Sequence, residues 1–115
     1  RCRFFCDNLQ EWEPKKSYYS LIWIQWVLSY LTDDDIIALL RRCAAALDDG
    51  LIVLKENVCT ESDFQVDLQD ASVTRSLRYW LYLIGQAGLR VLHWKWQSNL
   101  PEDLYPVPIL ALTLK

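Results

Sequence analysis

The chain has 115 residues, of which 52% are hydrophobic and 23% are charged, and its formal net charge is −3 at pH 7. This length suits one domain or part of one and is sufficient to bury a core. The acidic balance argues against a nucleic-acid partner held by phosphate neutralisation and favours a cationic ligand. No apolar run reaches the roughly 18 residues of a membrane span, so we expect no membrane partner either.

Four cysteines are spread along the chain without the paired spacing of a zinc site or a disulfide framework: Cys2, Cys6, Cys43 and Cys59. We therefore expect reduced thiols and no bound metal, in a protein of the cytoplasm, the nucleus or both. The only histidine, His93, lies in a late amphipathic segment, which argues against a nucleophilic triad. Because the chain opens at Arg1 without methionine or a signal peptide, we expect it to be part of a larger protein.

Strands and one helix are predicted in the first half of the chain. Residues 2–7 form a candidate edge strand, and residues 19–26 form a second strand. The nearly unbroken apolar run Leu21–Trp26 indicates burial on both faces, with Trp23 in the core. Thr32, followed by three aspartates, predicts a helix start, and Gly50 predicts a left-handed end to that helix. Residues 51–54 then form a third strand.

The second half of the chain also contains one predicted helix and further predicted strands. A polar loop is expected through Gln69, and Asp70 can cap a second helix that ends near Gly88. Residues 89–97 and 107–114 are predicted strands that pair antiparallel, because only a short loop joins them. The whole pattern is typical of a layered α/β fold.

Polar residues stand at three strand ends, where ligands bind in open parallel sheets. They are Asn8-Leu9-Gln10, Gln25-Trp26 and Glu56-Asn57. Each group can equally serve to cap its own strand, but the three together favour a site. The chain has only three glycines and no Gly-x-Gly, so a phosphate-cradling loop is not among its motifs.

Several segments make the sequence resemble the protein N-terminal methyltransferases. These are NLQEWEP, YSLIWIQWVLSYLTD, LDDGLIVLKEN, DLQDASVTR and NLPEDLYPV. Members of that family use S-adenosyl-L-methionine to methylate the α-amine of proteins that begin Xaa-Pro-Lys or Xaa-Pro-Arg. The resemblance implies an incomplete Rossmann-like class I methyltransferase sheet. Residues 1–115 would be the C-terminal part of a single domain, without its first two strands and glycine-rich loop.

The resemblance also implies a cofactor site and a peptide site. Leu9 and Gln10 would border the adenine, and Gln25 would contact the methionine portion of the cofactor. Trp26 would pack on the substrate proline, and Asn57 would hydrogen-bond the first residue of the peptide. The remaining implied residues are a polar cluster that receives the basic third residue and approaches the amine, and a tyrosine that contacts the peptide: Asp67, Asp70, Ser72 and Tyr105.

The expected chemistry needs a carboxylate beside the amine. A peptide α-amine has a pKa near about 8, so it must lose a proton before it attacks the methyl group. Tyr30 occupies the position where the family commonly has a histidine, four residues after Trp26. Because a phenol is a poor base at neutral pH, Asp70 would carry more of the proton transfer. A purely structural interpretation of Asp70, as the cap of the second helix, stays open here.

Two other functions compatible with the sequence are a non-catalytic fragment or pseudoenzyme that still binds a peptide, and a related methyltransferase that acts on a small amine or on another protein side chain.

Overall fold

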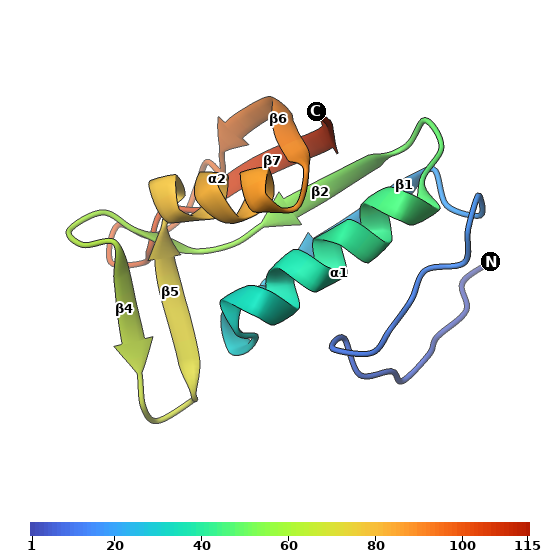
Figure 1. Cartoon of the computed structure of the whole chain (residues 1–115). Coiled ribbons are helices and arrows are strands. Elements are labelled where there is room, and N and C mark those ends of the chain that lie inside the picture. Colours follow the sequence, from blue (N-terminus) through green and yellow to red (C-terminus); the bar gives the residue numbers. More distant parts are fainter.

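A four-stranded sheet with two helices on one face forms the main body of the molecule. The computed structural model describes all 115 residues. The strand order is β1-β2-β7-β6, and the helices α1 and α2 contact each other in front of the sheet (Figure 1). The strands are β1 (Leu21–Gln25), β2 (Leu51–Lys55), β6 (Leu89–Trp96) and β7 (Pro108–Leu114); the helices are α1 (Asp33–Ala46) and α2 (Leu77–Gln86). The predicted α/β class is confirmed.

The β1–α1–β2 unit follows its sequence signals closely. β1 and β2 pair in parallel, with Ile22 opposite Ile52 and Ile24 opposite Leu54. The Thr32 side chain accepts a hydrogen bond from the Asp35 amide at 3.2 Å, which caps α1 as expected. The helix buries a stripe of apolar side chains against the sheet: Ile36, Leu39, Leu40, Cys43 and Ala46.

The last two strands pair antiparallel, as predicted. β7 also pairs antiparallel with β2, so it lies between β2 and β6 in the sheet. This insertion was not part of the prediction. Neither α1 nor α2 combines the length and apolar character that a helix needs to cross a membrane.

The predicted strand at residues 2–7 is wrong. Residues 1–8 have no regular secondary structure and are all exposed. The segment that follows is held by the Arg42 guanidinium, which donates to the carbonyls of Trp12 at 2.9 Å and Leu9 at 3.0 Å. No neighbouring strand offers the backbone groups that residues 2–7 would need, so their apolar character alone does not make a strand.

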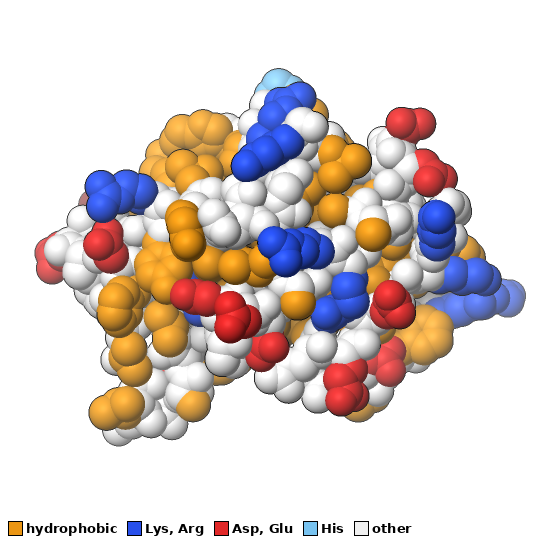
Figure 2. Space-filling view, viewed as in Figure 1, with side chains coloured by type: hydrophobic (Ala, Val, Ile, Leu, Met, Phe, Trp, Pro, Cys, Tyr) orange, Lys and Arg blue, Asp and Glu red, His pale blue; other side chains and the backbone are white.

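The predicted loop and helix start around residues 57–76 are also wrong. This stretch forms a second, three-stranded sheet of order β3-β5-β4, with β3 (Val58–Cys59), β4 (Phe64–Asp67) and β5 (Ser72–Ser76). β4 and β5 form a hairpin, and exposed apolar side chains lie over it on the left of Figure 2. α2 starts later, where the Ser76 hydroxyl accepts from the Tyr79 amide at 3.1 Å. Asp70 is therefore not a helix cap.

Only one face of β1 is buried, which corrects the expectation for Leu21–Trp26. Ile22 and Ile24 face α1, whereas Leu21 and Trp23 are 50% and 52% exposed. Trp23 is therefore not in the core; its indole Nε1 donates to Gln25 Oε1 at 2.9 Å. The alternation of exposed and buried residues shows that helices cover one side of this sheet only.

Gly50 is required for space rather than for a left-handed helix end. Its φ is not positive, but a Cβ here would lie 2.5 Å from the carbonyl oxygen of Ser20. The helix α1 ends earlier, with Leu47 in an extended conformation.

We expect Gly50→Ala to lower the free energy of unfolding by about 1–3 kcal/mol, because the backbone of Ser20 must move. Gly85→Ala is the matched control, since its Cβ meets only Lys115 Nζ at 3.7 Å. Inside α2 that change should stabilise by about 0.5–1 kcal/mol. Urea unfolding of both variants measures the two effects. Equal effects would contradict the packing assigned to Gly50.

Candidate functional site

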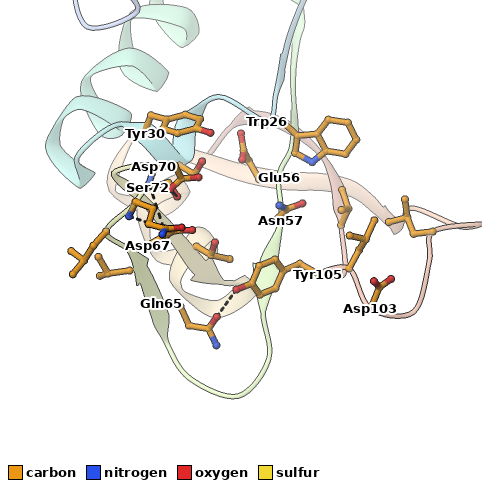
Figure 3. A pocket seen from close by; sticks show the side chains of 18 residues that line it. Trp26, Tyr30, Glu56, Asn57, Gln65, Asp67, Asp70, Ser72, Asp103 and Tyr105 are labelled. Atoms are coloured by element: carbon orange, nitrogen blue, oxygen red, sulfur yellow. Dashed lines mark hydrogen bonds between the residues drawn. The ribbon is translucent and has the colours of Figure 1, made fainter.

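A pocket of about 860 Å³ lies between the turn after β1, the β4–β5 hairpin and the loop before β7 (Figure 3). Its size is in the range of small-molecule and cofactor sites. Seven of the eighteen lining residues are predicted site residues: Trp26, Tyr30, Asn57, Asp67, Asp70, Ser72 and Tyr105. Residues distant in the sequence are thus brought to one cavity.

Trp26 stands at the pocket in an unusual backbone conformation. Its φ is +51°, a left-handed value that is rare for a bulky residue and costs on the order of 1–3 kcal/mol. The Trp26 amide donates to the carbonyl of Lys55 at 3.0 Å, which continues the pairing of β1 with β2 by one residue. The left-handed turn breaks the strand alternation and places the indole at the pocket, where Figure 3 shows it on the same side as Tyr30.

The β4–β5 hairpin presents its carboxylates through its own turn. Asp67 Oδ1 accepts from the amides of Gln69 at 2.9 Å and Asp70 at 3.3 Å, which shapes the connection. Asp70 Oδ1 accepts from the Ser72 hydroxyl at 2.5 Å, while its Oδ2 has no partner in the protein. The alternative of Asp70 as a helix cap is therefore wrong, and one oxygen of this exposed carboxylate is available to a ligand.

The pocket is acidic. Four carboxylates line it, from Glu56, Asp67, Asp70 and Asp103, and no lysine, arginine or histidine does. Glu56 is 5% exposed, and burial raises the pKa of this carboxyl above its ordinary value, against the opposing effect of its hydrogen bonds to the Leu28 and Val27 amides. Such a set of negative groups suits a cationic ligand, as the net charge of the chain suggested.

The loop before β7 forms another wall of the pocket. The Tyr105 hydroxyl donates to Gln65 Oε1 at 2.5 Å, which ties this loop to β4 (Figure 3). Gln65 and Asp103 were not among the predicted site residues, and Glu56 was predicted only as a member of the strand-end group Glu56-Asn57. The alternation Phe64-Gln65-Val66-Asp67 is a period-2 strand signal that could have identified the face carrying Gln65. No comparable signal marks Asp103.

The three predicted cofactor residues do not line this pocket. Leu9 is half-buried against the core, and the Gln10 amide Nε2 donates to Asp35 Oδ2 at 3.0 Å. Gln25 directly precedes Trp26; its Oε1 accepts from Trp23, while its Nε2 has no protein partner. The Gln25 amide thus keeps free hydrogen-bonding capacity at the carboxyl end of β1, which suits a zwitterionic ligand. The assignment of these three residues stays a prediction.

Comparison with known proteins decides the family. Residues 1–113 match the model of a family described as AdoMet-dependent proline di-methyltransferase. The chain belongs to this family. N-terminal Xaa-Pro-Lys N-methyltransferase 1 of Danio rerio is 44% identical over 110 residues, covering 95% of this chain and 49% of that relative. Alpha N-terminal protein methyltransferase 1 of Schizosaccharomyces pombe is 45% identical over 112 residues, covering 96% and 51%.

Solved structures agree with membership of the proline di-methyltransferase family. A SAM-dependent methyltransferase of Leishmania major superposes with a TM-score of 0.86 at 37% identity, covering 93% of this chain and 43% of that one. Mitomycin 7-O-methyltransferase gives a TM-score of 0.73 at 24% identity, which supports the methyltransferase fold alone. The expected partial Rossmann-like fold is confirmed, and the chain spans about half the length of the curated relatives it matches.

Proposed function

We propose that this chain forms the C-terminal part of a single S-adenosyl-L-methionine-dependent methyltransferase domain that methylates the α-amine of proteins beginning Xaa-Pro-Lys or Xaa-Pro-Arg. The observation that carries the proposal is the acidic pocket: seven predicted site residues gather there, and no basic side chain lines it. Membership of the family supplies the reaction class.

Asp70 is the group that we assign to proton transfer. The incoming α-amine is mostly protonated at neutral pH and must lose a proton to become a nucleophile. The free Oδ2 of Asp70 can attract the ammonium and accept that proton, directly or through water, while the Ser72 hydroxyl orients the other oxygen. Tyr30, exposed on the rim of the pocket, orients the amine rather than deprotonating it.

The peptide contacts follow from the remaining side chains. Trp26 offers an aromatic face for the proline, and Asn57 offers an amide to the first residue. Asp67 supplies a carboxylate to the basic third residue, and Tyr105, which is hydrogen-bonded to Gln65, borders the peptide. A cationic amine near these aromatic rings gains about 0.5–2 kcal/mol.

We assign the border of the cofactor site to Leu9, Gln10 and Gln25. When bound, the cofactor supplies an electrophilic sulfonium methyl group. The unpartnered Nε2 of Gln25 can hydrogen-bond the carboxylate end of that molecule, one residue before Trp26 and thus next to the peptide site.

Four free cysteines support a reducing, intracellular setting, in the cytoplasm, the nucleus or both.

The proposal is tested by mass spectrometry of peptides incubated with S-adenosyl-L-methionine and the longest natural chain that contains this sequence. An Xaa-Pro-Lys peptide should gain methyl groups at its α-amine. The same peptide with an acetylated N-terminus, or with alanine in place of proline, should gain none. Methylation of the acetylated peptide or of small amines in preference to the free peptide would contradict the proposed substrate.

Tyr30, at the position where the family commonly has a histidine, favours one alternative, namely a protein that binds the peptide without methylating it. Calorimetry separates the two. The proposed enzyme binds both the Xaa-Pro-Lys peptide and S-adenosylhomocysteine, whereas a peptide-binding pseudoenzyme binds the peptide alone.

A further inference from the structure

A buried carboxylate supports the turn that carries Trp26. Glu56, directly after β2, is 5% exposed, yet its carboxylate forms no hydrogen bond or ion pair with another side chain. Its Oε2 accepts hydrogen bonds from the backbone amides of Val27 at 3.0 Å and Leu28 at 3.1 Å. A buried carboxylate is costly unless it is well hydrogen-bonded, so these two bonds set where Glu56 and the turn lie relative to each other.

The turn has no local means of satisfying these amides. The 3₁₀ helix η1 (Leu28–Tyr30) starts after Val27, and no side chain of the turn caps it. Glu56 therefore takes the place of the missing cap from a neighbouring strand end. Without it, two amide groups at the site would lack acceptors beside a left-handed Trp26.

The far end of the same segment is held by a second buried charge. Arg75 is 2% exposed; its Nη2 donates to the Leu31 carbonyl at 3.0 Å and its Nε to Asp33 Oδ1 at 3.0 Å. The segment between Trp26 and Asp33 is thus fixed at both ends, by Glu56 after β2 and by Arg75 in β5, and its middle carries Tyr30 at the pocket.

We propose that Glu56 is a positioning residue for the peptide site: through the amides of Val27 and Leu28 it fixes the turn that places Trp26 against the substrate. This inference rests on the proposed function for its substrate, but the hydrogen bonds that it invokes are independent of that function. It predicts an effect on the peptide rather than on the cofactor, and a dependence on an acceptor oxygen rather than on charge.

The test compares Glu56→Ala with Glu56→Gln and with the exposed matched control Glu61→Ala, in the longest natural chain that contains this sequence. Glu56→Ala should raise the KM of an Xaa-Pro-Lys peptide about ten-fold or more, since two buried amides lose their acceptor. The KM of the cofactor should change less than about three-fold, and Glu56→Gln should recover most of the loss because its amide oxygen still accepts. Glu61→Ala should behave as the parent protein.

Hydrogen exchange monitored by NMR supplies a readout that does not depend on activity. The amides of Val27 and Leu28 should be protected in the parent protein and in Glu56→Gln, and should exchange about ten-fold faster or more in Glu56→Ala. Unchanged exchange in Glu56→Ala, or a Glu56→Gln variant as impaired as Glu56→Ala, would overturn the inference. If the parent protein methylates no peptide, the proposed function fails while the exchange rates still decide whether Glu56 holds the turn.

Discussion

Asp70→Asn is expected to lower the rate of methyl transfer to an Xaa-Pro-Lys peptide by about 100-fold or more, the usual contribution of a general base. The substitution keeps an oxygen that can accept from the Ser72 hydroxyl, so the hairpin turn should persist. What it removes is the negative charge and the basic oxygen beside the amine. Single-turnover measurements at saturating peptide and cofactor isolate this effect from binding.

The control for Asp70→Asn is Asp49→Asn, an exposed carboxylate outside the pocket. That change should leave the rate unaltered. Cofactor affinity, measured by calorimetry with S-adenosylhomocysteine, should be nearly the same in both variants. An Asp70→Asn variant with the activity of the parent protein would refute the assignment of Asp70 as the base.

Trp26→Ala is expected to weaken binding of the Xaa-Pro-Lys peptide by about ten-fold or more, as expected for an aromatic anchor in a recognition site. Trp26 is 45% exposed, so its removal should not open a cavity in the core. The loss should therefore appear in peptide affinity much more than in the free energy of unfolding. Calorimetric titrations with peptide and with S-adenosylhomocysteine give the two affinities.

Trp94→Ala is a matched control for Trp26→Ala, because Trp94 is 51% exposed but lies on β6 outside the pocket. The Trp94→Ala variant should bind the peptide with the affinity of the parent protein. If Trp26→Ala weakens peptide and cofactor binding equally, Trp26 does not have a specific role in holding the substrate.

Local signals in the sequence were sufficient for the β1–α1–β2 unit and for the final strand pair. Thr32 and the three following aspartates specify the start of α1 because cap and helix dipole act within one turn. β2 contains an uninterrupted apolar run, and its three central residues are buried as that run predicts. In contrast, the exposure of Trp23 depends on which elements cover the second face of the sheet, and no local pattern in β1 reveals that.

The second sheet was missed because its strands are short and partly polar. Val58–Cys59 has two residues, and the β4–β5 hairpin is stabilised by pairing across the turn rather than by a long apolar run. Asp70 precedes an apolar helical repeat, which made a cap plausible, but Ser76 is the residue that stands at the actual helix start. Asp70 and Ser76 are both residue types that cap helices. Only the presence of β5 between them shows that the helix begins after Ser76.

Polar residues at the strand ends form only part of the site. Of the residues at those ends, Trp26, Glu56 and Asn57 line the pocket, because they follow the neighbouring strands β1 and β2. Asp67, Ser72 and Tyr105 came from the family resemblance, because their approach to the pocket depends on the hairpin and on the loop before β7. The role of Glu56 could be derived only from its hydrogen bonds to Val27 and Leu28.

Mapping the binding of a free Xaa-Pro-Lys peptide by NMR tests the central claim most directly. In the longest natural chain that contains this sequence, the amide shifts that change on titration should cluster around Trp26, Asn57, Asp70 and Tyr105. The acetylated peptide should produce much smaller changes at these positions, since it lacks the cationic amine. Equal changes with both peptides, or changes confined to surfaces outside the pocket, would contradict the claim that this acidic pocket receives a protein N-terminus.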